Sequence, residues 1–385
     1  MNIFYLVLFF SIAIPIFVKN KKVGLLISFM LLLIPWGFQY QMTQDWDVHF
    51  LRWQHVNYNE RIELDGGEER VLEPLYVLYM KMCKPFSFYG FLIISAVLEL
   101  SMFFYFVKRY VSPNYYWVTI FLLMINVKYG LLLIDTNRQT LALLLSMAGI
   151  VFLDKSALYK DSSFKSFCFF ILSIVFFYLS PKVHSSSNIV FLTIPLFLYG
   201  RYVKSPNRFF LFLLFNTLFL LRFYIDTRQY QLAIYLNWDK VDLEGMDFMG
   251  KYLDEIENTS GSFIITIIEL LFMNVFIYFY NKMGTIYRLF ALLWMLSFIL
   301  GGFLTGSLAR VTLYFYVYLI FVIPKIIELL YEKYGSKNAI VNICITLIFA
   351  YFLFTFVKQM TNTTDGYYYY RWHHFQTLFQ APEWI

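Results

Sequence analysis

The sequence predicts an all-α, polytopic membrane protein, and three observations lead to this fold class. Of its 385 residues, 60% are hydrophobic, 22% are aromatic and only 15% are charged, a composition that no ordinary soluble domain has. Apolar runs of about 16–20 residues recur along the whole chain, which is long enough for helices to cross a bilayer core. The alternating segments of an outer-membrane barrel are absent. We therefore expect one integral membrane domain over residues 1–385, without internal repeats.

The apolar runs predict about twelve transmembrane helices. Their ranges are 2–18, 23–38, 89–107, 115–134, 138–153, 166–180, 187–200, 208–225, 260–280, 288–304, 307–324 and 338–357. The first run does not fit a cleaved signal peptide, because its basic cluster follows the apolar segment instead of preceding it. The same order predicts that the N-terminus lies outside and the first loop in the cytoplasm.

Basic residues recur at every turn that this orientation places in the cytoplasm. These short loops hold 16 Lys and Arg residues and only four acidic residues, as the positive-inside rule requires. The outward side carries two long loops, 39–88 and 226–259, and a C-terminal tail, 358–385. Residues 73–86 are too short and interrupted to span, so we expect an interfacial helix there. Function is expected on the outer face, where the long polar segments lie.

An arginine opens one span, in the stretch LLLIDTNRQTLALLL. At a helix centre such a charge costs roughly 2.5–3.5 kcal/mol on insertion scales, but the topology places Arg138 at the outer end of its span. Helical spacing puts it on one face with three small residues, Ala142, Ser146 and Gly149, which favour close helix packing. Either Arg138 is structural and pairs with Asp135 or caps helix ends, or it binds an anion through its permanently charged, planar fork.

Further arginines lie at the outer ends of other predicted spans. Arg222, with Arg228 just beyond it, ends one span, and Arg310 lies in a later one. A single such residue fits a snorkelling anchor at the membrane surface. Several arginines from different helices instead indicate a cavity for a polyanionic headgroup, such as a lipid pyrophosphate.

A histidine occupies the short outward turn YLSPKVHSSSN between two predicted spans. The imidazole of His184 is a candidate to take a proton from a sugar hydroxyl. Alternatively, it hydrogen-bonds the first turn of the next helix, where Ser185 to Ser187 offer an N-cap.

The first outward loop opens with carboxylates and aromatic residues, in QMTQDWDVHFLRWQH. Asp45 and Asp47 flank Trp46, and Arg52 follows. Paired carboxylates serve as a general base, as metal ligands or as partners of sugar hydroxyls, and flat rings suit stacking on sugar faces. A solvated turn explains these residues equally well. Further along, Glu73 is expected to cap the interfacial helix or to orient an arginine.

Two carboxyl groups, those of Glu99 and Glu269, lie nearer the middle of predicted spans. Intramembrane carboxyls are functional candidates, but these also fit a protonated structural role, or pairing with each other or with Lys128. Near the C-terminus, His373 and His374 lie in an aromatic segment without further ligands at suitable spacing for a metal. No cofactor is expected, and a divalent metal is not indicated.

Five short motifs follow one another along the chain. They are an Asp–aromatic pair (Asp45, Trp46), Glu-Pro-x-Tyr (Glu73, Pro74, Tyr76), Arg-Gln-x-x-Ala (Arg138, Gln139, Ala142), a turn His before a small residue (His184, Ser185) and Arg-x-x-x-Tyr-Phe (Arg310, Tyr314, Phe315). In this order the set resembles the EpsG family, Wzy-type polymerases of bacterial exopolysaccharide, capsule and O-antigen. The chain departs from the family pattern at Gln44, where Gly is usual, and at His49, where Tyr is usual.

This resemblance implies a glycosyltransferase of the bacterial inner membrane, multi-pass, with its active site facing the periplasm or exterior. Its fold would be similar to other multi-spanning, lipid-dependent (GT-C-like) glycosyltransferases. The growing glycan would move from polyprenyl diphosphate to the non-reducing end of a lipid-linked repeat unit. The implied catalytic residues are Arg138 and Arg310, which would stabilise the leaving diphosphate, and His184 or Asp45, which would act on the acceptor hydroxyl. The implied substrate-binding residues are Gln139, Asp47, Trp46, Arg52, Glu73 and Arg222.

The expected partners are the lipid-linked oligosaccharide and the bilayer, with a flippase and a chain-length regulator of the same pathway; nucleic acid is not expected. A flippase or exporter of the same lipid-linked oligosaccharide would also need an arginine-lined cavity. It would need charges along a path to both faces, whereas the candidates here gather on one side. An O-acyltransferase would place a histidine deep in a span. A ligase that moves finished glycan shares the donor chemistry and stays open.

Overall fold

The computed structural model describes most of the chain. The described residues are 2–40, 46–56, 61–63, 69–71, 73–126, 129–135, 137–159, 163–203, 206–221, 263–303, 310–361, 375 and 377. They are predominantly helical, as predicted, apart from a short antiparallel hairpin of β1 (Arg61–Glu63) and β2 (Glu69–Val71). The chain divides into two compact units, residues 1–190 with 323–385 and residues 191–322. The single membrane domain expected from the sequence stays a prediction.

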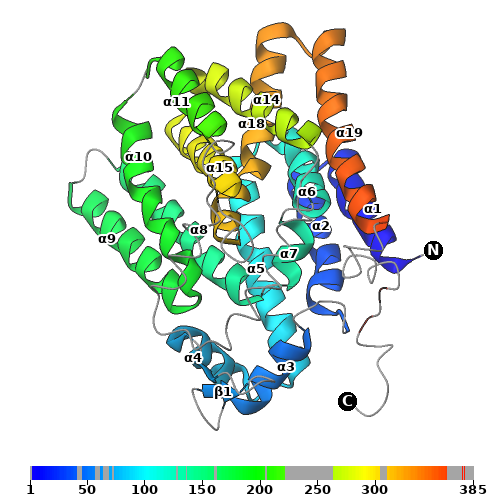
Figure 1. Cartoon of the computed structure of the whole chain (residues 1–385). Coiled ribbons are helices and arrows are strands. Elements are labelled where there is room, and N and C mark those ends of the chain that lie inside the picture. Colours follow the sequence, from blue (N-terminus) through cyan, green and yellow to red (C-terminus); the bar gives the residue numbers. More distant parts are fainter. Residues whose placement is uncertain are drawn as a thin grey trace. The chain divides into compact units, whose positions relative to one another are not determined.

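Helices of the first unit are labelled in Figure 1. They are α1 (Ile3–Phe17), α2 (Lys21–Gly37), α3 (Trp46–His55), α4 (Pro74–Cys83), α5 (Phe88–Tyr110), α6 (Tyr116–Ile125), α7 (Gly130–Asp135), α8 (Asn137–Leu158), α9 (Ser163–Leu179) and α19 (Ala339–Thr361). Short 3-10 helices join them: η1 (Pro113–Tyr115), η2 (Ser180–Lys182) and η3 (Ser185–Leu192). In this unit α2 packs against α1 and α5, and α1 also contacts α6.

The second unit is built around α15. Its elements are α10 (Thr193–Tyr202), α11 (Arg208–Leu221), α14 (Phe263–Phe279), η4 (Tyr280–Lys282), α15 (Thr285–Phe303), η5 (Arg310–Thr312) and α17 (Leu313–Tyr316), and α18 (Leu319–Tyr334) begins there and continues into the first unit. Within the unit α15 contacts α10, α11, α14 and α17. The buried Trp294 of α15 packs edge-on against Phe276 of α14, with ring centroids 4.8 Å apart.

Six helical segments among the described residues are long and apolar enough to cross a bilayer. They cover 88–110, 137–158, 164–182, 285–303, 313–334 and 339–361. Three shorter apolar helices cover 3–17, 113–125 and 208–221. These helices indicate a membrane protein, as the composition predicts, whereas the number of about twelve spans stays a prediction.

One predicted span, 115–134, is not continuous. Helix α6 ends at Ile125, Asn126 is extended with φ −74° and ψ 109°, and helical structure resumes at Gly130. The Gly130 N–H donates to the Asn126 carbonyl at 2.7 Å, and a Cβ at this position would lie 2.8 Å from the Leu123 carbonyl oxygen. The chain folds back over the end of α6 so closely that only glycine fits without a shift. The apolar run concealed this break because hydropathy reports composition and not backbone direction.

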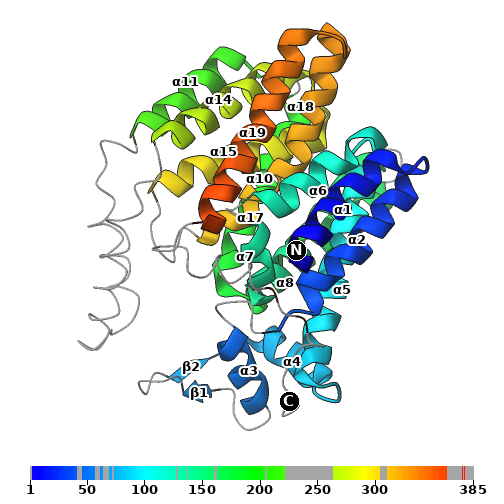
Figure 2. The ribbon, with the colours of Figure 1, turned by 90° about the vertical axis from the view of Figure 1, so that its right-hand side faces the viewer.

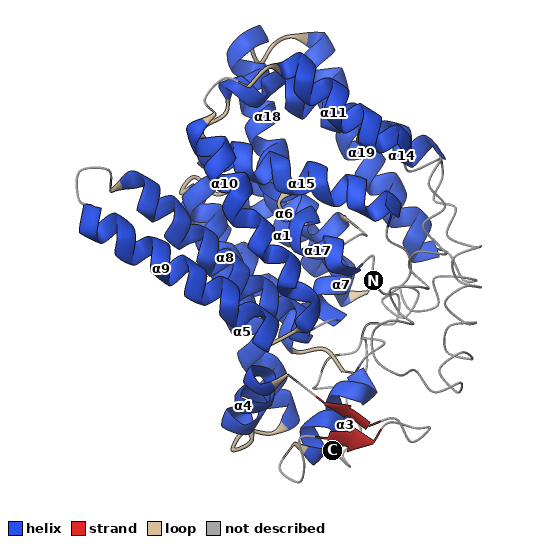
Figure 3. Ribbon diagram, turned by 60° about the vertical axis from the view of Figure 1, so that its left-hand side comes forward, coloured by secondary structure: helices blue, strands red, loops and turns tan. Residues whose placement is uncertain are grey.

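Helices α8 and α9 run side by side (Figure 3). Ala142 and Ser146 of α8 are buried, and a Cβ on Gly149 would lie 2.8 Å from Cε1 of Phe177. The face that helical spacing assigns to Arg138 and the small residues therefore faces protein, as predicted, because the missing side chain at position 149 lets the phenyl ring approach the helix.

Substitution of Gly149 by alanine is expected to destabilise the protein by about 1–3 kcal/mol, since the new methyl group overpacks a fully buried ring. The matched control is Gly301→Ala, where nothing lies within 4 Å of the added carbon. Thermal unfolding of the purified protein in detergent should show a lower midpoint for the first variant and no such decrease for the second. Shortening the opposing ring with Phe177→Leu should recover part of the loss. A Gly149→Ala variant as stable as the parent would contradict this packing.

The first predicted outward loop contains ordered structure rather than an open loop. Figure 2 shows α3, the hairpin and α4 gathered near the start of α5. The Lys84 ammonium group donates to the carbonyl oxygens of Trp53 at 2.6 Å and Gln54 at 3.2 Å, at the end of α3. The Tyr79 hydroxyl of α4 lies 2.8 Å from the Ser95 hydroxyl of α5. The predicted helix in 73–86 is present as α4, and its place at the membrane surface stays a prediction.

The described part of the C-terminal tail lies against the beginning of the chain. Thr377 forms an isolated antiparallel bridge with Gln39, and the buried Phe375 ring lies 6.1 Å from that of Phe4. His373 and His374 lie outside the described residues. The tail thus returns to the N-terminal helices, and the outward orientation expected for both ends stays a prediction.

Candidate functional site

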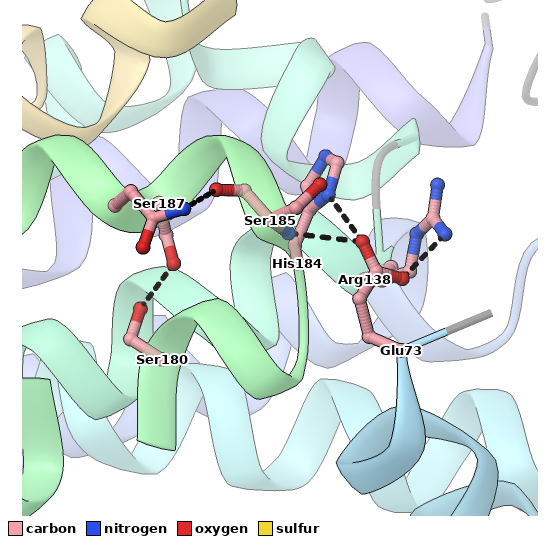
Figure 4. Close-up of polar contacts among 7 residues, drawn as sticks. Glu73, Arg138, Ser180, His184, Ser185 and Ser187 are labelled. Carbon is pink, nitrogen blue, oxygen red and sulfur yellow. Dashed lines mark hydrogen bonds and ion pairs between the residues drawn. The ribbon is translucent and has the colours of Figure 1, made fainter. Parts of the chain in front are cut away.

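The carboxylate of Glu73 is the centre of the candidate site. Glu73 precedes α4 at the N-cap position, with Pro74 following at N1, where the fixed φ of proline suits a helix start. Its side chain makes no capping bond to its own helix. It points instead toward α8 and the turn before η3, as Figure 4 shows.

Three groups from two other segments meet this carboxylate. Nη1 of Arg138, in the first turn of α8, lies 2.8 Å from Glu73 Oε2. Nδ1 of His184 lies 3.3 Å from Oε1, and the Ser185 N–H donates to the same oxygen at 2.9 Å. Arg138 and His184 are 65 and 111 residues away from Glu73 along the chain. Of the two roles considered for Glu73, orientation of an arginine is therefore confirmed, and capping of α4 by its side chain is wrong.

These partners keep the carboxyl group of Glu73 in its ionised form. Burial alone would raise the pKa of its carboxyl group, but the hydrogen bond with His184, the charge of Arg138 and the Ser185 N–H outweigh burial and lower the pKa to about 2. The group is therefore ionised at any physiological pH, and it can only accept hydrogen bonds.

The guanidinium of Arg138 is partly exposed and supplies further donors. Its side chain is 21% exposed, and it lies 5.9 Å from the ring centroid of the buried Tyr76. Among the described residues, Glu73 is its hydrogen-bond partner, through one nitrogen. A guanidinium carries five N–H donors in a fixed fork, so the contact orients the group while leaving donors for an anion. The alternative pairing with Asp135 stays a prediction, because the side chain of Asp135 is outside the described residues.

The imidazole of His184 is oriented by the same carboxylate. Because an ionised Glu73 only accepts, Nδ1 of His184 must donate its proton, and in the neutral imidazole Nε2 is then the nitrogen with the lone pair. The backbone on either side is also held: the His184 N–H donates to the Ser180 carbonyl at 3.1 Å, and the Ser187 N–H donates to the His184 carbonyl at 2.9 Å. The site therefore combines a fixed cation with an oriented imidazole.

The two carboxyl groups that the sequence places within predicted spans accept hydrogen bonds from other helices. Glu99 of α5 is buried and accepts from Trp36 Nε1 of α2 at 2.6 Å and from Asn137 Nδ2 at 3.4 Å. It thereby anchors the residue that precedes Arg138. In the second unit Glu269 accepts from the Tyr316 hydroxyl at 2.5 Å. Lys128, the other partner considered for them, is outside the described residues.

Three further candidates from the sequence are buried. Trp46 is 6% exposed; the Phe50 ring stacks on it at 5.4 Å and the Phe88 ring meets it edge-on at 5.3 Å. In this structure its faces are covered by protein, so stacking on a sugar stays a prediction that needs these rings to move. Arg52 of α3 and Gln139 of α8 are also buried, and their substrate contacts stay predictions.

The remaining candidates lie outside what the structure describes. Asp45, Arg222 and the loop 226–259 are outside the described residues, as are the side chains of Asp47 and of Arg310, which opens η5 in the second unit. The convergence of several arginines stays a prediction. Within the described residues, no group of three or more His, Cys, Asp or Glu side chains is placed to hold a metal ion.

One protein-family model matches nearly the whole chain. The family model described as the EpsG family matches residues 22–372, a span that includes Glu73, Arg138 and His184. Comparison with curated proteins and with solved structures finds no match. The expected likeness in fold to other multi-spanning, lipid-dependent glycosyltransferases therefore stays a prediction.

Proposed function

The chain belongs to the EpsG family, a polysaccharide-polymerase type of membrane protein, and we propose that it polymerises lipid-linked glycan repeat units. In this proposal the growing glycan moves from polyprenyl diphosphate to the non-reducing end of the next lipid-linked repeat, on the outer face of the bacterial inner membrane. A flippase and a chain-length regulator would be its partners. One observation carries the proposal: Arg138 and His184, from separate segments, meet on the ionised carboxylate of Glu73.

The proposed reaction needs a cation beside the leaving diphosphate and a base beside the attacking hydroxyl, and the site contains a guanidinium and an imidazole. The bond between the anomeric carbon and the diphosphate oxygen breaks, and negative charge builds on the leaving diphosphate. Donors that are already oriented toward that charge stabilise the transition state without reorganisation, and a guanidinium matches phosphate oxygens in geometry. We assign this role to Arg138, with Glu73 holding its orientation.

The attacking group is a sugar hydroxyl of the acceptor repeat. As its oxygen bonds to the anomeric carbon, its proton must leave, and Nε2 of His184 is the proposed acceptor of that proton. General bases of this kind contribute about 10²- to 10⁴-fold. Nδ1 stays hydrogen-bonded to Glu73 during the step, which stabilises the imidazolium that forms.

The test of the reaction uses purified protein and a synthetic lipid-linked repeat unit. A ladder of products that grow by whole repeats supports the polymerase. Unchanged substrate that crosses a vesicle bilayer would identify a flippase, and a single transfer onto a different acceptor, without a ladder, would identify a ligase. Either of these two results in place of the ladder contradicts the proposal.

His184→Gln is expected to lower the rate of polymerisation by about 10²-fold or more, because the amide keeps the approximate size of imidazole but cannot accept the proton. Binding of the lipid-linked donor should change little. Lys182→Gln, an exposed position in the same turn, is the control and should keep the parental rate. Initial rates of ladder formation measure the effect, and a His184→Gln variant at the parental rate would refute the role of this imidazole.

A further inference from the structure

Three serines form a buried cluster beside the candidate site. Oγ of Ser180, in η2, lies 2.8 Å from the Ala142 carbonyl oxygen and 3.1 Å from Ser146 Oγ, both in α8. It also lies 2.8 Å from Ser187 Oγ, in η3. All three serine side chains are at most 2% exposed. The Ser180 hydroxyl donates toward both the Ala142 carbonyl and Ser187 Oγ, which share its one proton, and Ser146 can donate to it. Ser180 therefore joins three elements at a single atom.

This cluster encloses the turn that carries His184. Ser180 and Ser187 flank the turn, their side chains meet each other (Figure 4), and their backbone groups bond to the N–H and the C=O of His184. The anchor of the cluster on α8 lies one and two helical turns after Arg138, at Ala142 and Ser146. The same helix therefore carries Arg138 and determines where the His184 turn is attached.

We infer that Ser180 is a positioning residue that sets the place of His184 relative to Arg138 and Glu73. This inference rests on the proposed function, because it assumes that His184 acts in the reaction. The Glu73 bond to Nδ1 is long, at 3.3 Å, so it orients the imidazole well only when the backbone of the turn is fixed in place. The buried hydroxyl cluster supplies the attachment from the opposite side of the turn.

The geometry predicts a graded series of alanine variants. Ser180→Ala removes all three links and should lower kcat by about ten- to a hundred-fold, as misplacement of a reacting group does. Ser187→Ala removes the link across the turn and should have a smaller effect. Ser146→Ala leaves Ser180 bound to Ala142 and Ser187, so its effect should be the smallest. KM for the lipid-linked donor should stay within about twofold, since Arg138 is not displaced.

The control is Ser28→Ala. Ser28 is equally buried, but its hydroxyl bonds, as far as the described residues show, only the Gly24 carbonyl of its own helix, at 3.0 Å. Its loss reports what removal of a buried hydroxyl does to the folded membrane protein away from the site. Rates are divided by the amount of monodisperse protein, so that a loss of folded protein is not read as a loss of kcat.

A double-mutant cycle with His184→Gln decides the outcome. If Ser180 acts through His184, adding Ser180→Ala to His184→Gln lowers the rate no further. An equal fall in both backgrounds, or a Ser180→Ala variant with the kcat of Ser28→Ala, overturns the inference and leaves the proposed function intact. If His184→Gln is fully active, the general-base assignment fails and this inference fails with it. Should Ser180→Ala not fold, the same cycle with Ser187→Ala distinguishes these results.

Discussion

Alanine in place of Arg138 is expected to lower kcat for polymerisation by about 10²- to 10³-fold, the usual loss when one oriented donor to a developing anion is removed. The guanidinium is the charge that the structure holds beside the proposed general base. A fixed donor acts mainly on the transition state, so kcat should fall more than the affinity for the donor substrate. Initial rates of ladder formation with purified protein measure the effect.

Lysine at position 138 separates charge from geometry. It keeps the positive charge but loses the planar fork, so Arg138→Lys should recover only part of the lost rate. Arg109→Ala is a matched control. Arg109 of α5 contacts Asp154 at 2.8 Å with 26% and 16% of the side chains exposed, against 2.8 Å, 21% and 14% for Arg138 and Glu73.

The Arg109–Asp154 and Arg138–Glu73 ion pairs have similar distances and exposure but lie at different positions along α8. Asp154 follows Arg138 by sixteen residues on α8, which places the pairs about 24 Å apart along the helix. Arg109→Ala should therefore cost similar stability and leave the rate per folded molecule unchanged. Equal losses of rate in the two variants would mean that Arg138 is structural, and full polymer from Arg138→Ala would remove it from the mechanism.

Glu73→Gln is expected to lower the polymerisation rate by about 10²-fold through its contacts with Arg138 and His184, while direct binding of substrate by Glu73 stays a prediction. The neutral amide no longer attracts Arg138, and it can present a donor instead of an acceptor to Nδ1 of His184. Both reacting groups lose their common anchor, and displacement by about 1 Å can cost this much in rate. The effect on unfolding should be about 1 kcal/mol, because the pair is not fully buried.

The matching control for this variant is Asp154→Asn, which breaks the other ion pair in the same way and should retain the rate. Glu73→Asp keeps the charge on a side chain shorter by one methylene, so it should fall between the parent and Glu73→Gln. If Glu73→Gln and Asp154→Asn lose activity equally, the carboxylate serves the fold and not the site.

Acid titration gives an independent check on Glu73. Its pKa is lowered from 4.5 to about 2 in the folded protein, so its ionised form contributes stability that is complete above pH 4.5. That contribution is lost as the pH falls toward about 2. The difference in thermal midpoint between the parent and Glu73→Gln should be constant from pH 7 to about 5 and shrink below it. A difference that disappears already near pH 6 would contradict the lowered pKa.

The contacts of Glu73 give a physical reason for a carboxylate in a site that is proposed to bind a diphosphate. One nitrogen of Arg138 contacts Glu73, and this single contact limits the rotation of a long side chain. Within the part of the chain that the structure describes, the remaining donors of Arg138 are available to an incoming anion. Because Glu73 also contacts Nδ1 of His184, one carboxylate orients the cation and the proposed base together, and the net charge of Glu73 and Arg138 is zero before the substrate binds.

Length and composition were enough to predict a helical membrane protein, because hydropathy and charge act locally along each segment. Helical spacing likewise placed Arg138 on a face of small residues, and the order of five short motifs indicated the family. Spacing could not find the break before Gly130, which depends on a close backbone approach, or the burial of Trp46 among other rings. It also could not find the partner of Arg138. Glu73 and His184 are far from it in the chain, and periodicity relates residues only within one element, so their meeting depends on how α4, α8 and the turn before η3 pack together.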